Sequence, residues 1–173
     1  MNFRKATQKD INSIEKIYSD THAQEERGEV TIGWVRSVYP TRATAEQALL
    51  RGDLFLCELD GEIVATAIIN QQQVAEYYGA NWEYTAEDSE VMVLHTLVVS
   101  PSAAGQGVGK AFVKFYEDYA LSHGCNFLRM DTNAKNLRAR AMYKKLGYNE
   151  RGIIPCIFNG IQGVDLVLLE KKI

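Results

Sequence analysis

The sequence predicts an α/β protein in which a mixed central sheet of about six to seven strands has helices on both faces. Two apolar, strand-like runs are each followed by a polar turn and a helix-forming segment, which is typical of strand–helix units. Two dipeptides of the hairpin type, Asp60-Gly61 and Asn159-Gly160, join further strand-like runs. The expected order over residues 1–173 is β-α-α-β-β-β-α-β-α-β-β, in a single domain.

The N-terminal part predicts one short strand and two helical stretches. Residues 3–6 have the length of a strand, and residues 7–10 resemble a capping box at the start of a helix. Apolar side chains then recur at helical spacing, at Ile11, Ile14, Ile17 and Tyr18. We expect a second helix over parts of residues 33–48, interrupted near Pro40 because proline removes a backbone donor.

The middle of the chain predicts a hairpin and a buried strand. Leu54–Leu59 and Glu62–Asn70 have strand character and are joined by the turn dipeptide Asp60-Gly61. Residues 76–90 are polar and irregular. Val91–Val99 is predominantly apolar and β-branched, which favours a central strand.

The last part of the chain predicts two helices, a strand between them and a closing hairpin. Residues 108–121 form a helix, and its expected apolar face comprises Val108, Ala111, Phe112, Phe115 and Tyr119. After a strand at residues 127–132, residues 137–146 form a helix between the N-cap Asn136 and the terminating Gly147. Residues 148–157 and 161–169 then close the sheet.

Composition excludes several classes of protein. Hydrophobic residues make up 46% and charged residues 24% of the chain, which is ordinary for a soluble globular protein. The net charge of −3 argues against nucleic acid as a partner, and no apolar run approaches the roughly 20 residues of a membrane span. Residues 1–5 lack the apolar core of a signal peptide, so we expect a cytoplasmic protein.

Cysteine and histidine spacing predicts neither a disulfide nor a metal site. Cys57, Cys125 and Cys156 are odd in number and far apart, and no histidine stands at a ligand spacing from them. We expect reduced thiols and no metal.

A glycine-rich turn at residues 104–110 separates the central strand from the helix that follows. Such a turn leaves backbone N–H groups free at the positive end of a helix dipole, which favours a phosphate. The turn is not a P-loop, because Ala111 stands where Ser or Thr is required. It is not a dinucleotide fingerprint either, because the third glycine, Gly109, comes one residue early.

The turn resembles the acetyl-CoA loop of the GNAT superfamily of N-acetyltransferases. That loop has Arg or Gln, two residues, Gly, one residue, and Gly or Ala; Gly107 and Gly109 match its last two positions. Ala104 departs from the first position, which removes one side-chain contact to a pyrophosphate and leaves the backbone contacts.

A second block matches the same family. GNAT proteins carry the pattern Asn-x-x-Ala-x-x-hydrophobic-Tyr-x-x-x-Gly-aromatic in this region. The residues that fill it in register are Asn136, Ala139, Met142, Tyr143, Gly147 and Tyr148. The chain therefore resembles GNAT enzymes strongly over residues 91–148. Elsewhere it resembles them only in the order of its helices and strands.

The resemblance implies the GNAT fold and acetyl-CoA as co-substrate. Its pantetheine arm is expected on the backbone of a central strand that splays from residues 127–132, with the Val98 N–H facing the thioester oxygen. Its pyrophosphate is expected on the N–H groups of residues 106–110. The full set of expected CoA-binding residues is Leu97, Val98, Val99, Ala104, Gly105, Gln106, Gly107, Val108, Gly109, Lys110, Asn136, Tyr143 and Lys145.

The resemblance also implies that Tyr143 is the general acid that protonates the departing thiolate, since a phenol of pKa about 10 suits an alkyl thiol. A core-facing aromatic is the alternative. His95 is the candidate base, because strand alternation would place it on one face with Leu97 and Val99. A histidine that only lines the pocket is equally open, and Glu90 is the reserve base.

The segment before the central strand offers a clue to the acceptor. Its acidic and aromatic side chains are Glu76, Tyr77, Tyr78, Trp82, Glu83, Tyr84, Glu87, Asp88 and Glu90. If the segment borders the acceptor pocket, as it often does in GNAT folds, it would attract a cationic amine. A solvated charged loop is the alternative.

Together these observations predict an N-acetyltransferase that moves an acetyl group from acetyl-CoA directly to a primary amine of a small molecule, in a ternary complex. No Cys or Ser has the setting of a nucleophile. Two alternatives stay open: acetylation of a protein N-terminus or lysine, and a non-catalytic acyl-CoA sensor. Nucleic acid and membrane are not expected as partners, and the closing hairpin is where a homodimer contact would form.

Overall fold

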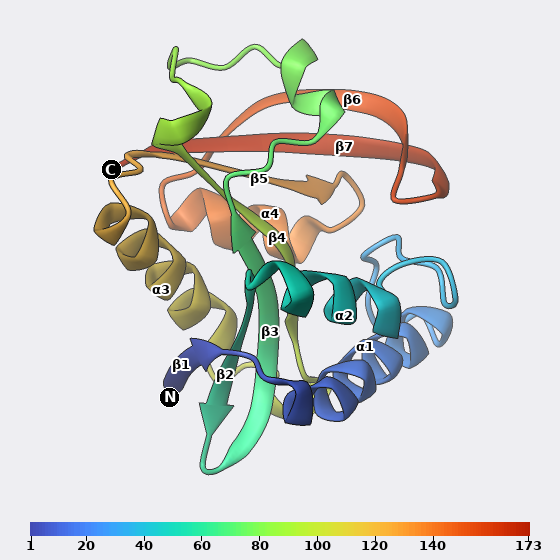
Figure 1. The fold of residues 1–173 in the computed structure, drawn as a ribbon. Coiled ribbons are helices and arrows are strands. Elements are labelled where there is room, and N and C mark those ends of the chain that lie inside the picture. Colours follow the sequence, from blue (N-terminus) through green and yellow to red (C-terminus); the bar gives the residue numbers. More distant parts are fainter.

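The computed structural model describes residues 1–173, and its elements follow the predicted order (Figure 1). Their bounds are β1 (Asn2–Lys5), α1 (Ile11–Glu26), α2 (Arg42–Arg51), β2 (Leu54–Leu59), β3 (Glu62–Asn70), β4 (Val91–Val99), α3 (Val108–Ser122), β5 (Phe127–Asn133), α4 (Leu137–Lys145), β6 (Asn149–Phe158) and β7 (Ile161–Lys172). The strands form one sheet in the order β1-β2-β3-β4-β5-β7-β6. Only β4 and β5 are parallel neighbours, so the expected mixed sheet is confirmed.

Helices cover both faces of the sheet and bury two separate apolar clusters. On the face that we call the α1–α2 face, the cluster includes Ile11, Ile14, Leu54, Leu56 and Ile68. On the opposite α3–α4 face, the cluster includes Phe55, Ala67, Met92, Leu94 and Phe112. Removal of this apolar surface from water is the main driving force for the layered arrangement.

The segment between β3 and β4, residues 71–90, covers the remaining part of the α1–α2 face beside β6 and β7 (Figure 1). It buries Tyr77 against a third cluster that includes Val91, Val93 and Leu168. None of the helices combines the length and the apolar character needed to cross a membrane.

The second helix begins later than the sequence predicts. Residues 33–40 are not helical; a bridge between Val35 and Tyr39 closes a turn there, and α2 starts at Arg42. Proline disfavours helical geometry at the residue before it, so Tyr39 stays outside the helix, which can begin only after Pro40. Thr41 then caps the helix, and its N–H donates to the Thr44 Oγ1 at 3.0 Å. We refer to residues 28–40 as loop 28–40.

The buried face of α3 is also rotated from the predicted one. Its fully buried apolar residues are Val108, Phe112, Val113, Tyr116 and Ala120. Phe115 and Tyr119 lie at the rim, where they contact the rings of Phe3 and Phe55. The Tyr116 hydroxyl explains part of the shift, because it donates to the Met92 carbonyl at 2.6 Å beneath the helix.

The parallel pair β4–β5 separates halfway along its length. Pairing runs from Val91–Phe127 to Leu94–Met130, after which β5 continues beside β7 alone. On its other edge β4 has one extra residue relative to β3, and Thr96 at that point has a φ of 52°. This β-bulge bends β4 away from β5, so the expected splay is present.

Candidate active site

A cavity of about 1140 Å³ lies where β4 and β5 part. Its wall includes Val108, Met142 and Tyr143 from the α3–α4 face, and Tyr39 and Arg51 from the α1–α2 face. We call these the α3–α4 side and the α1–α2 side of the cavity. The volume exceeds that of many single-ligand pockets, and two molecules could meet in it at the gap between the strands.

The glycine-rich turn forms one end of the α3–α4 side. Gly105 and Gly107 have φ values of 80° and 77°, in the left-handed region that glycine adopts without strain. The N–H groups of residues 107–110 have no acceptor within the protein, because they begin α3. These free donors at a helix N-terminus fit a phosphate.

The Gln106 N–H differs from the others in this turn. It donates to the Ala103 carbonyl at 3.3 Å, so it is not free for a ligand as expected. Its side chain donates to the Ser102 carbonyl at 3.2 Å, and Gln106 does not line the cavity. Ala104 and Gly105 do line it.

Beyond the bulge, the backbone of β4 presents an edge to the gap. Ser100 donates its N–H to the Val64 carbonyl at 2.7 Å, which makes this a hydrogen-bonded pair of the β3–β4 ladder. Because such pairs alternate, the Val98 N–H in the same register points toward Thr66. The expectation that the Val98 N–H faces the gap is therefore wrong, whereas the backbone groups of Leu97 and Val99 do point into it.

Asn136 and Tyr143 reach the same side of the cavity from α4. The Asn136 Oδ1 accepts from the Ala139 N–H at 3.2 Å, so this side chain caps the helix while it lines the cavity. Tyr143 packs edge to face on Tyr148 with ring centroids 6.0 Å apart. Its hydroxyl has no protein partner, and burial, with a contribution from the charge of Asp131, raises its pKa. The phenol is thus protonated at neutral pH.

Basic residues extend the α3–α4 side outward. A smaller hollow of about 400 Å³ adjoins the cavity and is lined by Lys110, Arg138 and Lys145. Lys110 and Arg138 belong to both spaces, so the two are continuous. Arg140 is not available to a ligand, because its guanidinium pairs with Glu150 at 2.7 Å.

His95 lies on the α1–α2 side, opposite Leu97 and Val99. It pairs with Ile68, which belongs to the α1–α2 cluster, whereas Leu97 and Val99 pack on the α3–α4 cluster. The expectation of one shared face is wrong, because the extra residue at the bulge reverses the alternation of side chains after Thr96.

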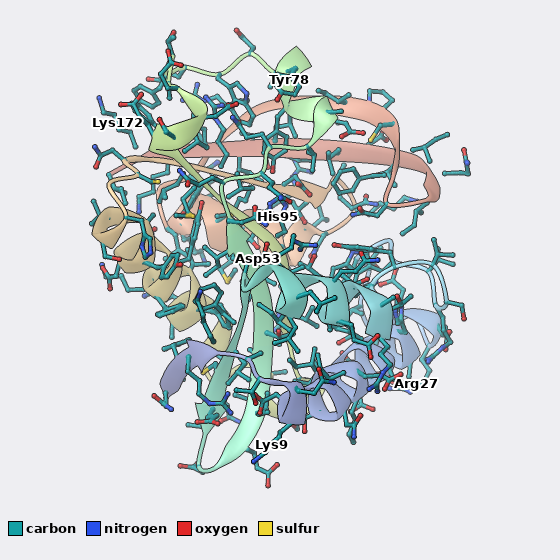
Figure 2. All side chains as sticks on the ribbon, in the orientation of Figure 1. Lys9, Arg27, Asp53, Tyr78, His95 and Lys172 are labelled. Atoms are coloured by element: carbon teal, nitrogen blue, oxygen red, sulfur yellow. The ribbon has the colours of Figure 1, made fainter.

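A chain of hydrogen bonds fixes the tautomer of His95. The Asn70 amide donates through Nδ2 to Asp53 at 2.8 Å and accepts the Gln72 N–H through Oδ1 at 2.9 Å. The His95 Nε2, 3.1 Å from that oxygen, is therefore the donor. Figure 2 shows His95 and Asp53 close together at the centre of the molecule.

Burial lowers the pKa of His95 to about 4, with a partly compensating hydrogen bond to the Gln72 backbone. The imidazole is neutral at pH 7, but it holds a proton too weakly to serve well as a base there.

Asp131 is a site residue that the sequence analysis missed. It follows Met130, the last residue of β5 that pairs with β4, and lines the cavity on the same face of the sheet as His95. The Tyr77 hydroxyl donates to its Oδ2 at 2.8 Å. Burial outweighs that bond and raises the pKa of Asp131 to about 7. An acidic residue inside a strand-like run was the signal that could have indicated it.

The acidic segment does not border the cavity. Glu90 is exposed at the start of β4, at the opposite end of that strand from the gap, and its carboxylate accepts the Glu87 N–H at 3.0 Å. Glu83 pairs with Arg151 over β6, and Tyr78 projects from the edge of the molecule, away from His95 (Figure 2). Neither Glu90 as reserve base nor an acidic rim fits this geometry.

Loop 28–40 instead covers the α1–α2 side. Gly33 lies so close to β5 that a Cβ there would be 2.3 Å from the Asn133 Nδ2. Val38 reaches the β6–β7 turn, where a Cβ on Gly160 would be 3.3 Å from its Cγ1. The Glu25 carboxylate anchors the loop by accepting the Gly33 N–H at 2.8 Å. The cavity is therefore roofed by this loop between α1 and the β6–β7 hairpin.

The cysteines take no part in the site. Cys57 and Cys125 are buried, Cys156 is half-buried, and all three are free thiols. No group of three or more His, Cys, Asp or Glu side chains is arranged to hold a metal ion.

Comparison with known proteins connects this geometry to a family. The model of the acetyltransferase (GNAT) family matches residues 12–148. An uncharacterized N-acetyltransferase of Methanocaldococcus jannaschii is 23% identical over 173 residues, which cover 99% of this chain and 92% of the relative. A second one from that organism is 27% identical over 100 residues, which cover 58% of this chain and 40% of the relative.

Solved structures share the fold. A GNAT-family acetyltransferase of Streptococcus agalactiae superposes with a TM-score of 0.84 at 20% identity, covering 99% of this chain and 95% of the other. A protein of Salmonella typhimurium solved with its cofactor acetyl-CoA superposes with a TM-score of 0.67 at 17% identity, covering 99% and 92%. At these identities the likeness shows the fold.

Proposed function

Because the chain belongs to the GNAT family of acetyltransferases, we propose that it moves an acetyl group from acetyl-CoA directly to a primary amine of a small molecule, in a ternary complex. The observation that carries the proposal is the cavity at the parted strands. It presents Tyr143 from the α3–α4 side and Asp131 with His95 from the α1–α2 side. Residues 1–173 act as one catalytic domain in this proposal.

Acetyl-CoA fits the α3–α4 side. The free N–H groups of residues 107–110 suit its pyrophosphate, and the unpaired β4 edge at Leu97 and Val99 suits the amides of its pantetheine arm, as an added strand would. The Asn136 Nδ2 remains free after its oxygen caps α4. Lys110, Arg138 and Lys145 supply positive charge for further phosphate.

The acceptor amine would enter from the α1–α2 side and attack the thioester carbon through the gap. Most amines are protonated at neutral pH, so a base must first remove a proton. Asp131, with its pKa raised to about 7, suits that task better than His95, whose pKa is lowered to about 4. We therefore assign the base to Asp131 and leave His95 to position Asn70 and line the pocket.

Tyr143 would act from the other side of the gap. When the carbon–sulfur bond breaks, its protonated hydroxyl can donate to the departing sulfur. The attacking nitrogen loses a second proton as the amide forms, and this proton replaces the one that Tyr143 gave to the sulfur. The proton taken by Asp131 returns to solvent, so a protonated amine and the thioester become an amide, a thiol and one released proton. Acetyl-CoA itself supplies the activated acetyl group.

The roof formed by loop 28–40 favours a small acceptor over a protein. A peptide needs an open groove that its chain can follow, whereas Gly33 and Val38 of the loop contact Asn133 and Gly160 across the cavity. An unpaired, neutral Tyr143 hydroxyl in the cavity favours an enzyme over a sensor, because binding alone gives that group no task.

The test is thiol release from acetyl-CoA in the presence of amino acids, amino sugars, polyamines, aminoglycosides and peptides with free N-termini. Turnover of one class of small amine, with peptides inactive, is the expected result. Turnover of peptides alone would transfer the proposal to a protein substrate. Absence of thiol release with every amine tested, in a protein that binds acetyl-CoA, would favour the sensor.

A further inference from the structure

Arg51 brings a permanent positive charge to the α1–α2 side of the cavity. It is the last residue of α2 and lines the cavity together with Tyr39 and Asn70. The other lining lysines and arginines precede or begin α3 and α4, on the opposite side: Lys110, Lys135 and Arg138. Arg51 is thus separated from the groups that suit the phosphates of CoA.

A buried carboxylate orients the guanidinium of Arg51. Its Nε donates to the Asp53 Oδ2 at 2.8 Å and its Nη2 to the Asp53 Oδ1 at 3.2 Å. Asp53 is itself held by the Asn70 Nδ2 at 2.8 Å. This pair occupies one edge of the guanidinium, and Nη1 has no partner within the protein. The free end retains the planar arrangement of donors that matches a carboxylate.

Arg51 and Asp131 both line the cavity, together with Tyr39. The pKa of the Tyr39 phenol depends on both charges, because Asp131 raises it and Arg51 lowers it. Burial is the larger effect and brings this pKa to about 12. Tyr39 is itself fixed by a hydrogen bond to Thr96 at the bulge. The α1–α2 side of the cavity therefore presents an acidic group, Asp131, and a basic group, Arg51, together with the aromatic ring of Tyr39.

From this geometry we propose, on the basis of the proposed function, that the acceptor is an amino acid whose carboxylate binds Arg51 while its amine faces Asp131. A polyamine would place a second cation against Arg51, which is unfavourable in a partly desolvated wall. An amine without a carboxylate would leave the free end of Arg51 unused. An amino acid satisfies both charges in one orientation, which also directs the amine toward the gap.

The experiment compares matched acceptors in the thiol-release assay: free L-amino acids, their primary carboxamides and the corresponding decarboxylated amines. We expect kcat/KM for the free acid to exceed that for its carboxamide by about 10- to 100-fold, the usual range for a charge-assisted hydrogen bond. In Arg51→Gln the KM for the free acid should rise by that factor. The KM values for the carboxamide and for acetyl-CoA should not change.

Arg42→Gln is the matched control. Arg42 lies on the same helix, pairs with Glu15 and Glu46 at 2.7 Å on the surface, and does not line the cavity. It should retain the preference for the free acid in full.

Equal turnover of acid and carboxamide by the unaltered protein, or a preference that survives in Arg51→Gln, would overturn this inference and leave the proposed function standing. Because the acid–carboxamide comparison needs no variant, it decides the matter even if Arg51→Gln does not fold. Absence of thiol release with every class of amine would overturn the proposed function and this inference together.

Discussion

The two sides of the cavity are built in different ways. The α3–α4 side comes from two short stretches, residues 97–110 and 136–143, and its free N–H groups at residues 107–110 belong to the backbone. The α1–α2 side consists of side chains from segments far apart in the sequence, including Tyr39, Arg51, His95 and Asp131. The first side thus depends on chain conformation, which glycine and helix termini set, whereas the second depends on which side chain stands at each position. Members of a family can therefore keep the backbone conformation of the α3–α4 side and differ in acceptor through the side chains of the α1–α2 side.

Tyr143→Phe tests whether the two sides serve one reaction, and should have the largest effect. Loss of the hydroxyl should lower kcat by about 10²- to 10⁴-fold, the usual contribution of a general acid, and leave the KM for acetyl-CoA nearly unchanged. The fold should be unaffected, because this hydroxyl makes no hydrogen bond within the protein and only its ring packs on Tyr148. Steady-state kinetics with the best acceptor provide the measurement.

Tyr78→Phe is the control for that change, since Tyr78 is 77% exposed and lies outside the cavity. An unchanged kcat in Tyr143→Phe would separate the α3–α4 side from the chemistry and leave it a binding surface only.

Asp131→Asn tests the assignment of the base on the α1–α2 side. We expect kcat/KM to fall by about 10²-fold. In the unaltered protein kcat/KM should decrease about tenfold per pH unit below pH 7, because Asp131 has a pKa of about 7 and must be ionised to accept a proton. The variant should lack this acid limb. The measurement is a pH–rate profile over a range that extends about two units on either side of that pKa, from pH 5 to pH 9.

His95→Gln distinguishes the two candidate bases. The pKa of His95 is about 4, so the acid limb near pH 7 should persist in this variant. If the acid limb disappears in His95→Gln and persists in Asp131→Asn, the base is His95.

The raised pKa of Asp131 also predicts that Asp131→Asn, which should lower activity, will increase stability at neutral and higher pH. A carboxyl whose folded-state pKa lies above its ordinary value stabilises the fold while protonated, and that contribution is lost as the pH rises through about 7. Asp131→Asn should therefore raise Tm above pH 7 and leave it unchanged below pH 3.8, the ordinary pKa of the group. Thermal unfolding followed by circular dichroism, above pH 7 and below pH 3.8, is the measurement. Above pH 7 the variant should be more stable than the unaltered protein, although kinetics should show it to be less active. A Tm that falls equally at both would argue for a purely structural role.

Gly107→Ala tests the dependence of the α3–α4 side on backbone conformation. A residue other than glycine at a φ of 77° costs about 1–2 kcal/mol, so the turn should relax and the KM for acetyl-CoA should rise about tenfold. Gly124→Ala is matched to it, with a φ of 73° and open space around it at the other end of α3. It should lose similar stability with no change in that KM. Equal KM values in the two variants would show that the turn does not hold the cofactor.

Gly33→Ala should give the smallest effect, confined to the α1–α2 side. Its methyl group would displace the Asn133 side chain and lift loop 28–40, so the acceptor KM should rise severalfold while the acetyl-CoA KM stays constant. Gly28→Ala, in the same loop with a φ of 72° and no neighbour within 4 Å, controls for strain alone. A rise in the acetyl-CoA KM instead would mean that the loop belongs functionally to the α3–α4 side.

The difference between the two sides also explains what could be anticipated. The order of elements, both hairpins, the Asn136 cap and the glycine-rich turn follow from local rules of periodicity, turn chemistry and capping, and the structure contains all of them. Prediction from local patterns failed where pairing with a distant strand changed the local geometry. Strand alternation placed His95 with Leu97, but a bulge that suits the pairing of β4 with β3 reversed it.

By itself, the sequence determined the fold class and the conformation of the glycine-rich turn, because glycine, proline and apolar spacing act within a few residues along the chain. Only the tertiary structure decided which charged side chains line the cavity. Asp131 has an unusual pKa because the folded chain buries it beside Tyr77, and Arg51 is aimed by Asp53 and Asn70. Glu90 has an equally suitable carboxylate but ends up at the far end of β4. Burial and the neighbours contributed by distant segments set the function of a side chain here, and neither is a property of the local sequence.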